Sequence, residues 1–230
     1  MGLRNIEVRV RGRRAAQNRL MRRPGFGTIN PSGGLYGGWR RFGALSWKTL
    51  SREEIYRGAV FTVFEQTSAG PEGREGTFQV LEARDWAVVV PLLRMEREAQ
   101  FLMVRQYRHG SDESSLEFPG GVIEDEEAPE KAAARELAEE TGWIPSVLLH
   151  AGTVFPNPAI QSNRFHVYLA LDPYPAVDRN LDEDEVVDAL LMPAKAVHDG
   201  MGEGELSHAL MATALFLAEK CMLKHGIAAY

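Results

Sequence analysis

Cysteine is nearly absent from this sequence, which holds one, Cys221, in 230 residues. A single thiol cannot form an internal disulfide framework or a zinc cluster of thiolates, so the sequence predicts a protein of the reducing cytoplasm. Long apolar runs are absent as well. The longest, around residues 87–93, has the length of a strand, whereas a membrane-spanning helix needs roughly 20 apolar residues. We therefore expect no membrane span, and the 44% hydrophobic content is enough for a packed core.

Acidic residues are almost missing from residues 1–45, which carry ten Arg and a single acidic residue, Glu7. The whole chain, in contrast, has a formal net charge of −6. Because no sustained helical or strand periodicity follows Val10, we predict that residues 1–45 are an Arg-rich extension outside the core. Several roles stay open for it: a basic arm on nucleic acid or another anionic surface, a dimerisation arm, a targeting segment, a poorly ordered tail, or sequence upstream of a true start at Met21.

The sequence after residue 45 alternates between short apolar runs and turn residues, which is typical of a folded domain over residues 46–230. Runs at 59–66 and 76–81 flank the turn-rich segment SAGPEGREG and predict an N-terminal antiparallel β-hairpin region, residues 46–84. Strands on both sides of a helix favour a mixed sheet sandwiched by helices, in the α/β (α+β) class. The expected strands lie at 87–93, 101–107, 147–155, 164–170 and 186–192, and the expected helices near 193–198 and at 205–223.

The segment from Gly121 to Trp143, GVIEDEEAPEKAAARELAEETGW, is rich in carboxylates and still has the features of a helix. Pro129 suits a first helical turn, the alanines favour its continuation, and Gly142 is a natural left-handed stop. The sequence therefore predicts a helix from Pro129 to Thr141. Charge alone would favour a solvated helix face, so the spacing of the carboxylates has to decide between the two interpretations.

The spacing of Glu136, Glu139 and Glu140, at i, i+3 and i+4, places their side chains on one helix face. Like charges so placed repel, which makes sense if divalent cations lie among them, and carboxylate oxygens suit Mg²⁺ or Mn²⁺. Gly120 and Gly121, just upstream, let the backbone approach the helix, so that a glycine carbonyl can complete the site. Mg²⁺ held by carboxylates usually shares its shell with substrate phosphates.

These residues resemble the Nudix box, GX5EX7REUXEEXGU, and match each of its fixed positions. Only Trp143 departs from it, because the final bulky position is more often Ile, Leu or Val. The resemblance implies a Nudix fold, an α/β/α sandwich, with residues 85–230 as its catalytic core. The matching residues are Gly121, Glu127, Arg135, Glu136, Glu139, Glu140 and Gly142.

The resemblance also implies roles for individual residues. Glu136 and Glu140 would be the principal metal ligands, and Glu139 and the Gly120 carbonyl further ones. Arg135 would pair with Glu127 to brace the loop against the helix.

Two flanking segments resemble the ADP-ribose pyrophosphatase branch of this superfamily. One is the strand Val104–Arg108 with its QYR sequence, followed by Leu116–Gly121, and the other is Pro158, sixteen residues after Gly142. The Ser-x-Glu that usually follows this proline is missing, so we keep the broader substrate class. The substrate-binding residues implied are Arg105, Arg108, Glu117 and Pro158.

The expected activity is divalent-metal-dependent hydrolysis of the diphosphate bond of a nucleoside diphosphate sugar such as ADP-ribose, giving a nucleoside monophosphate and a sugar phosphate. A nucleoside triphosphate pyrophosphohydrolase and a non-catalytic nucleotide-sensing regulator are the alternatives. The general base is expected on the acidic loop 181–185, with Glu183 first, Glu185 second, and Glu139 also a candidate, although such a loop can equally be a solvated turn. The branch further implies a homodimer that exchanges N-terminal strands.

Aromatic and histidine residues complete the set of candidates. Four aromatic side chains are available to stack on a nucleobase, although core packing is the competing interpretation. The histidines His166 and His208 lack a partner spacing for a transition-metal site, so we predict structural roles for both. The aromatic candidates are Phe61, Phe64, Trp86 and Phe155.

Overall fold

The computed structural model of the chain describes residues 46–181 and 186–228. The predicted Arg-rich extension 1–45 and the candidate bases Glu183 and Glu185 lie outside this described part. Within it, no helix is long and apolar enough to cross a membrane.

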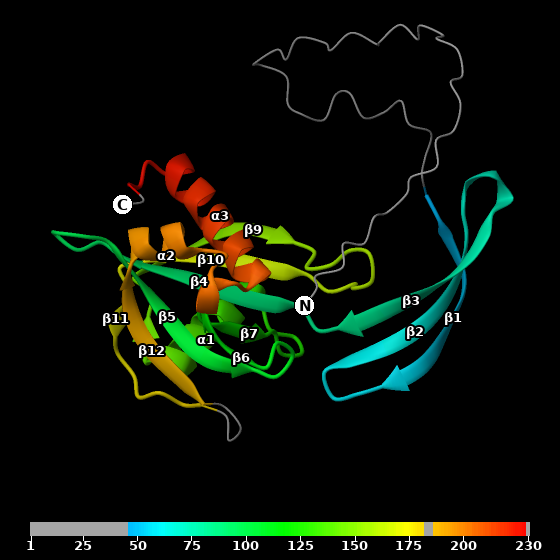
Figure 1. Cartoon of the computed structure of the whole chain (residues 1–230), viewed down its shortest axis with the longest axis horizontal. Coiled ribbons are helices and arrows are strands. Elements are labelled where there is room, and N and C mark those ends of the chain that lie inside the picture. Colours follow the sequence, from blue (N-terminus) through cyan, green and yellow to red (C-terminus); the bar gives the residue numbers. More distant parts are fainter. Residues whose placement is uncertain (1–45, 182–185, 229–230) are drawn as a thin grey trace, which may run out of the picture. The chain divides into compact units, whose positions relative to one another are not determined.

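The N-terminal part of the described chain is a three-stranded antiparallel sheet, in the order β1-β2-β3. The strands are β1 (Lys48–Arg57), β2 (Phe61–Ala69) and β3 (Glu75–Ala83), drawn in blue to teal in Figure 1. The hairpin of β2 and β3 is the one that the sequence predicts, and β1 was missed. Charged residues break the alternation of β1, and two register shifts interrupt its pairing with β2, which explains the weak sequence signal.

A seven-stranded mixed sheet forms the centre of the fold, in the order β12-β5-β4-β10-β9, with β6 paired to β5 and β7 to β4. All of these pairs are antiparallel except β4 with β10. The sequence missed the short strands β6 and β7, because so few residues show no period. The strand bounds are β4 (Trp86–Leu93), β5 (Gln100–Arg108), β6 (Glu113–Glu117), β7 (Gly120–Val122), β9 (Val147–Val154), β10 (Phe165–Leu171) and β12 (Val187–Pro193). The sequence also missed a separate small pair of strands, β8 (Trp143–Ile144) with β11 (Tyr174–Pro175).

Helices cover both faces of this central sheet (Figure 1), which confirms the predicted α/β/α sandwich. Alternate side chains of β4 show the layers, because successive residues of a strand point to opposite faces. Val88 and Val90 belong to the core cluster under α2 (Ala194–Gly200) and α3 (Ala209–Lys224). Ala87 and Val89 belong to the cluster under α1 (Pro129–Thr141).

The predicted C-terminal helix, 205–223, is wrong at its start. A short 3₁₀ turn, Gly204–Leu206, comes first, and α3 begins only at Ala209. Gly202 and Gly204 have positive φ values of 98° and 52°, and His208 is extended at φ −73° and ψ 116°, so an α-helix cannot run through this segment. This break lets the residues just before α3 turn toward the site described below.

Candidate active site

The short strand β7 brings two glycines against helix α1. A Cβ on Gly120 would lie 2.4 Å from the carbonyl oxygen of Ala87, and one on Gly121 would lie 2.4 Å from Oε1 of Glu136. Only a residue without a Cβ lets the backbone come this close. Gly120 is therefore needed for packing against the backbone of β4, whereas at Gly121 a Cβ would displace the flexible Glu136 carboxylate.

Helix α1 has the bounds that the sequence predicts. It begins at Pro129 and ends at Thr141; the next residue, Gly142, has a left-handed φ of 77°, and its N–H donates to Ala138 O at 2.8 Å. Its Glu140 is 3% exposed and accepts a hydrogen bond of 3.0 Å from the N–H of Gly120. Glu136, one turn earlier, reaches Gly121. Two carboxylates of one helix face thus flank the same pair of glycines.

Arg135 holds the acidic residues around it in place. Its Nε and Nη2 each donate to Glu127 at 3.0 Å, and its Nη1 donates to Glu136 at 2.9 Å and to Glu139 at 2.8 Å. The hydrogen bonds to Glu127 are the largest cause of the raised pKa of Arg135, and they lower the pKa of Glu127. The Nη2 group also donates to Val122 O at 3.1 Å, so the guanidinium joins the loop after β7 to the helix.

The carboxylates of Glu136, Glu139 and Glu140 are not gathered around one point in this structure. Among the described residues, no three His, Cys, Asp or Glu side chains form a group that could hold a metal ion. Arg135 binds Glu136 and Glu139, and Glu140 accepts a hydrogen bond from the N–H of Gly120. The donor chemistry still fits a hard divalent cation, since Glu136 and Glu140 present carboxylate oxygens one turn apart. Their role as metal ligands stays a prediction.

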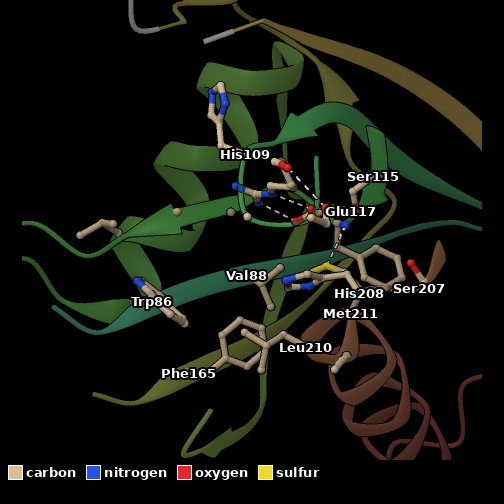
Figure 2. A pocket seen from close by; sticks show the side chains of 18 of the residues that line it. Trp86, Val88, His109, Ser115, Glu117, Phe165, Ser207, His208, Leu210 and Met211 are labelled. Atoms are coloured by element: carbon tan, nitrogen blue, oxygen red, sulfur yellow. Dashed lines mark hydrogen bonds and ion pairs between the residues drawn. The ribbon is translucent and has the colours of Figure 1, made fainter. Parts of the chain in front are cut away.

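A cavity of about 660 Å³ lies next to these carboxylates, and Gly120 and Gly121 form part of its wall. Figure 2 shows side chains from the central sheet on one part of the wall and from the start of α3 on another. Of the predicted site residues, Arg108, Glu117 and Trp86 also line it. Further residues of the wall are Val88, Ser115, Phe165, His208, Leu210 and Met211.

Glu117 is a buried anion on the cavity wall, with 1% of its surface exposed. Arg108 binds it with two hydrogen bonds, 2.7 Å from Nε and 2.6 Å from Nη2. Burial by itself raises the pKa of Glu117, but the hydrogen bonds and charge of Arg108, with smaller contributions from His208 and Ser115, bring the pKa below its ordinary value. The carboxylate is therefore ionised at neutral pH.

The other substrate-binding candidates lie elsewhere. Arg105 pairs with Glu205 at 3.1 and 3.2 Å and, within the described residues, is not part of the cavity wall. The sequence left open which arginine reaches the site, and the cavity contains Arg108. Pro158 is exposed in the loop before β10, and it too is absent from the described wall.

One of the aromatic candidates lies at the cavity, and others lie elsewhere. Trp86 lines the cavity, whereas Phe64 packs under Arg52 and Phe155 lies near Arg164. His166 bonds to Thr153 Oγ1 at 3.1 Å and lies 3.4 Å from Asp85. The sequence missed the cavity residues Phe165, Leu210 and Met211, because nothing in a sequence links strand β10 and the start of α3 to the strand that carries Glu117.

The comparison with protein families fits this geometry. The family model described as NUDIX domain matches residues 83–211, which is more than half of the chain. The chain therefore belongs to the Nudix family, and it is a Nudix hydrolase by its fold and box. Members of this family generally use divalent metal ions.

The chain is also similar to individual proteins of this family. A protein named ADP-ribose pyrophosphatase from Bacillus subtilis (strain 168) is 30% identical over 148 residues, covering 64% of this chain and 78% of that protein. A protein named ADP-sugar pyrophosphatase from Mus musculus is 32% identical over 127 residues, covering 51% of this chain and 58% of its own length. A crystal structure of an ADP compounds hydrolase superposes with a TM-score of 0.68 over 79% of this chain and 97% of that one, at 23% identity, which shows a shared fold.

Proposed function

We propose that this protein hydrolyses the diphosphate bond of a nucleoside diphosphate sugar such as ADP-ribose, giving a nucleoside monophosphate and a sugar phosphate. One observation carries the proposal: Glu136 and Glu140 flank the glycines that form the wall of a 660 Å³ cavity. Relatives named ADP-ribose and ADP-sugar pyrophosphatase support the substrate class.

The residues of the site suit this reaction. Glu136 and Glu140 would hold Mg²⁺ or Mn²⁺, and such an ion neutralises charge on the diphosphate and activates a water. Arg135 keeps Glu136 in place and joins the helix to the loop through Glu127. Arg108 stays a proposed substrate-binding residue because it lies on the cavity wall, although its Nε and Nη2 already bind Glu117. Glu139 and the loop residues Glu183 and Glu185 remain the proposed candidates for the general base.

Two finer assignments belong to the same proposal. We propose a homodimer, supported by the large apolar side chains that are exposed on β1 to β3, among them Leu50, Ile55 and Phe78. Large contiguous apolar patches on a protein surface mark interaction sites, and these side chains would supply such a patch. We propose a cytoplasmic location, which the single buried thiol of Cys221 supports.

A panel of diphosphates tests the activity. Full-length protein with Mg²⁺ or Mn²⁺ is given ADP-ribose, ADP-glucose, GDP-mannose, UDP-glucose and a nucleoside triphosphate, and the products are separated. We expect a nucleoside monophosphate from at least one nucleotide sugar, and a loss on the order of 100-fold for Glu140→Gln, since changes to the partners of metal ligands already cost roughly 10–100-fold. Glu130→Gln, on an exposed position of the same helix, should keep the activity.

Two results would contradict the proposal. One is no monophosphate from any nucleotide sugar, and the other is full activity of Glu140→Gln. Pyrophosphate released only from the triphosphate would favour the pyrophosphohydrolase alternative.

A further inference from the structure

His208 lies at the cavity, immediately before α3. Its backbone oxygen accepts hydrogen bonds from the N–H groups of Met211 at 3.0 Å and Ala212 at 3.3 Å, whereas its side chain does not cap the helix. Figure 2 shows the imidazole among the side chains of the wall, near Glu117 and Met211. The backbone of His208 therefore accepts the first hydrogen bonds of α3, whereas its side chain takes no part in capping the helix.

The imidazole has a buried nitrogen with no partner. Among the described residues, Nδ1 of His208 makes no hydrogen bond although it is buried. A buried polar atom that lacks a partner costs roughly 1–3 kcal/mol, so natural structures usually supply one from protein, water or ligand. Because a half-turn of the ring about its Cβ–Cγ bond exchanges nitrogen and carbon positions, the imidazole has two ways to offer a nitrogen to a ligand.

The surroundings of His208 indicate which chemistry that ligand has. Val88, Phe165, Leu210 and Met211 form an apolar part of the wall and offer no strong hydrogen-bonding side chain. Glu117 is the charged neighbour of His208, and Arg108 already neutralises it. An additional anion therefore gains little next to Glu117, whereas a hydroxyl group can donate to a carboxylate and also bond to an imidazole.

The proposed substrate presents hydroxyl groups at this place. Each phosphate of a nucleoside diphosphate sugar is attached to a sugar ring, so whichever half enters the cavity, a sugar comes directly after the diphosphate. Under the proposed function the diphosphate would lie at Gly120 and Gly121, beside Glu136, and His208 lines the same cavity. Resting on the proposed function, we propose that His208 determines specificity by hydrogen-bonding a hydroxyl of the sugar ring next to the diphosphate.

This assignment differs from the structural role that the sequence predicts for His208. That prediction considered only metal-ligand spacing, and the cavity is formed by residues far apart in the chain. The electrostatic influence of His208 on Glu117, which is 91 positions earlier, exists only in the folded protein.

Binding of an analogue that cannot be hydrolysed tests the role of His208. The dissociation constant of ADP-ribose with a methylene bridge in place of the bridging oxygen is measured with Mg²⁺ by calorimetry, for the wild type, His208→Ala and His208→Gln. One hydrogen bond changes binding by roughly fivefold. We expect about this loss for His208→Ala, and binding within about twofold of wild type for His208→Gln, whose amide keeps a donor and an acceptor.

A histidine away from the cavity serves as the control for this measurement. His225→Gln changes an exposed histidine at the other end of the same helix and should leave the dissociation constant unchanged. Equal binding by wild type and His208→Ala overturns the inference, and so does a loss in His208→Gln as large as that in His208→Ala, because a hydrogen-bonding role predicts rescue. If the substrate panel shows no turnover while His208→Ala still weakens the analogue, the proposed function fails and the inference stands.

Discussion

The ion pair of Arg108 with Glu117 gives a quantitative prediction for stability. Arg108→Met keeps most of the side-chain volume and removes the cation that, among the described residues, binds this carboxylate with two hydrogen bonds. Breaking a buried pair typically costs about 3–5 kcal/mol, because an uncompensated charge stays behind. Glu117 is 1% exposed but Arg108 is 43% exposed, so part of this cost is screened by water. We therefore expect a loss of about 2–3 kcal/mol in the free energy of unfolding at pH 7.

The pH dependence of this loss follows from the pKa of Glu117. In the wild type the folded pKa lies below the ordinary 4.5, so the stabilisation is present above pH 4.5 and is lost as the pH falls through the folded pKa. In Arg108→Met, burial becomes the dominant influence, and the folded pKa rises above 4.5. Glu117 of the variant then becomes protonated as the pH falls, which removes the unpaired buried charge. The difference between variant and wild type in the free energy of unfolding should therefore shrink between pH 7 and pH 5.

Urea unfolding of both proteins at pH 7 and pH 5 measures this difference, and Arg105→Met is the matched control. Arg105 lies on the same strand, but its pair with Glu205 is 42% and 39% exposed. Exposed pairs contribute roughly 0–1 kcal/mol, so the control should lose less than about 1 kcal/mol. Equal losses for the two variants, or a loss for Arg108→Met that stays the same at both pH values, would refute the reasoning.

Two further predictions concern packing and a buried amide. Gly120→Ala should reduce the thermal stability strongly and abolish activity, because the new Cβ would lie 2.4 Å from the backbone oxygen of Ala87, whereas Gly110→Ala, with open space around its Cβ, should leave the melting temperature nearly unchanged. Asn163→Leu should leave stability unchanged or raise it by up to about 1 kcal/mol in urea unfolding, since neither amide atom of the 2% exposed Asn163 has a hydrogen-bond partner among the described residues. A clear loss of stability in Asn163→Leu would mean that the amide is paired.

The sequence alone determined the features that depend on local order along the chain. Helix α1 has the predicted bounds because Pro129 and Gly142 act on the backbone beside them. The main strands of the central sheet follow from runs of apolar residues, and the spacing of the box was sufficient for the family. Strand β1 escaped prediction because its pairing with β2, rather than its own pattern, stabilises it.

Tertiary structure decided the features that depend on residues far apart in the chain. Helical spacing placed three carboxylates on one face, but Arg135 and Gly120 decide where those carboxylates point. Strand alternation separated Arg105 from Arg108, and only the folded cavity shows which of them reaches it. The break before Ala209 brings His208 near the buried Glu117, which lies 91 positions earlier in the chain. Spacing along a chain fixes which helix face a side chain occupies, whereas its partners come from packing between distant segments.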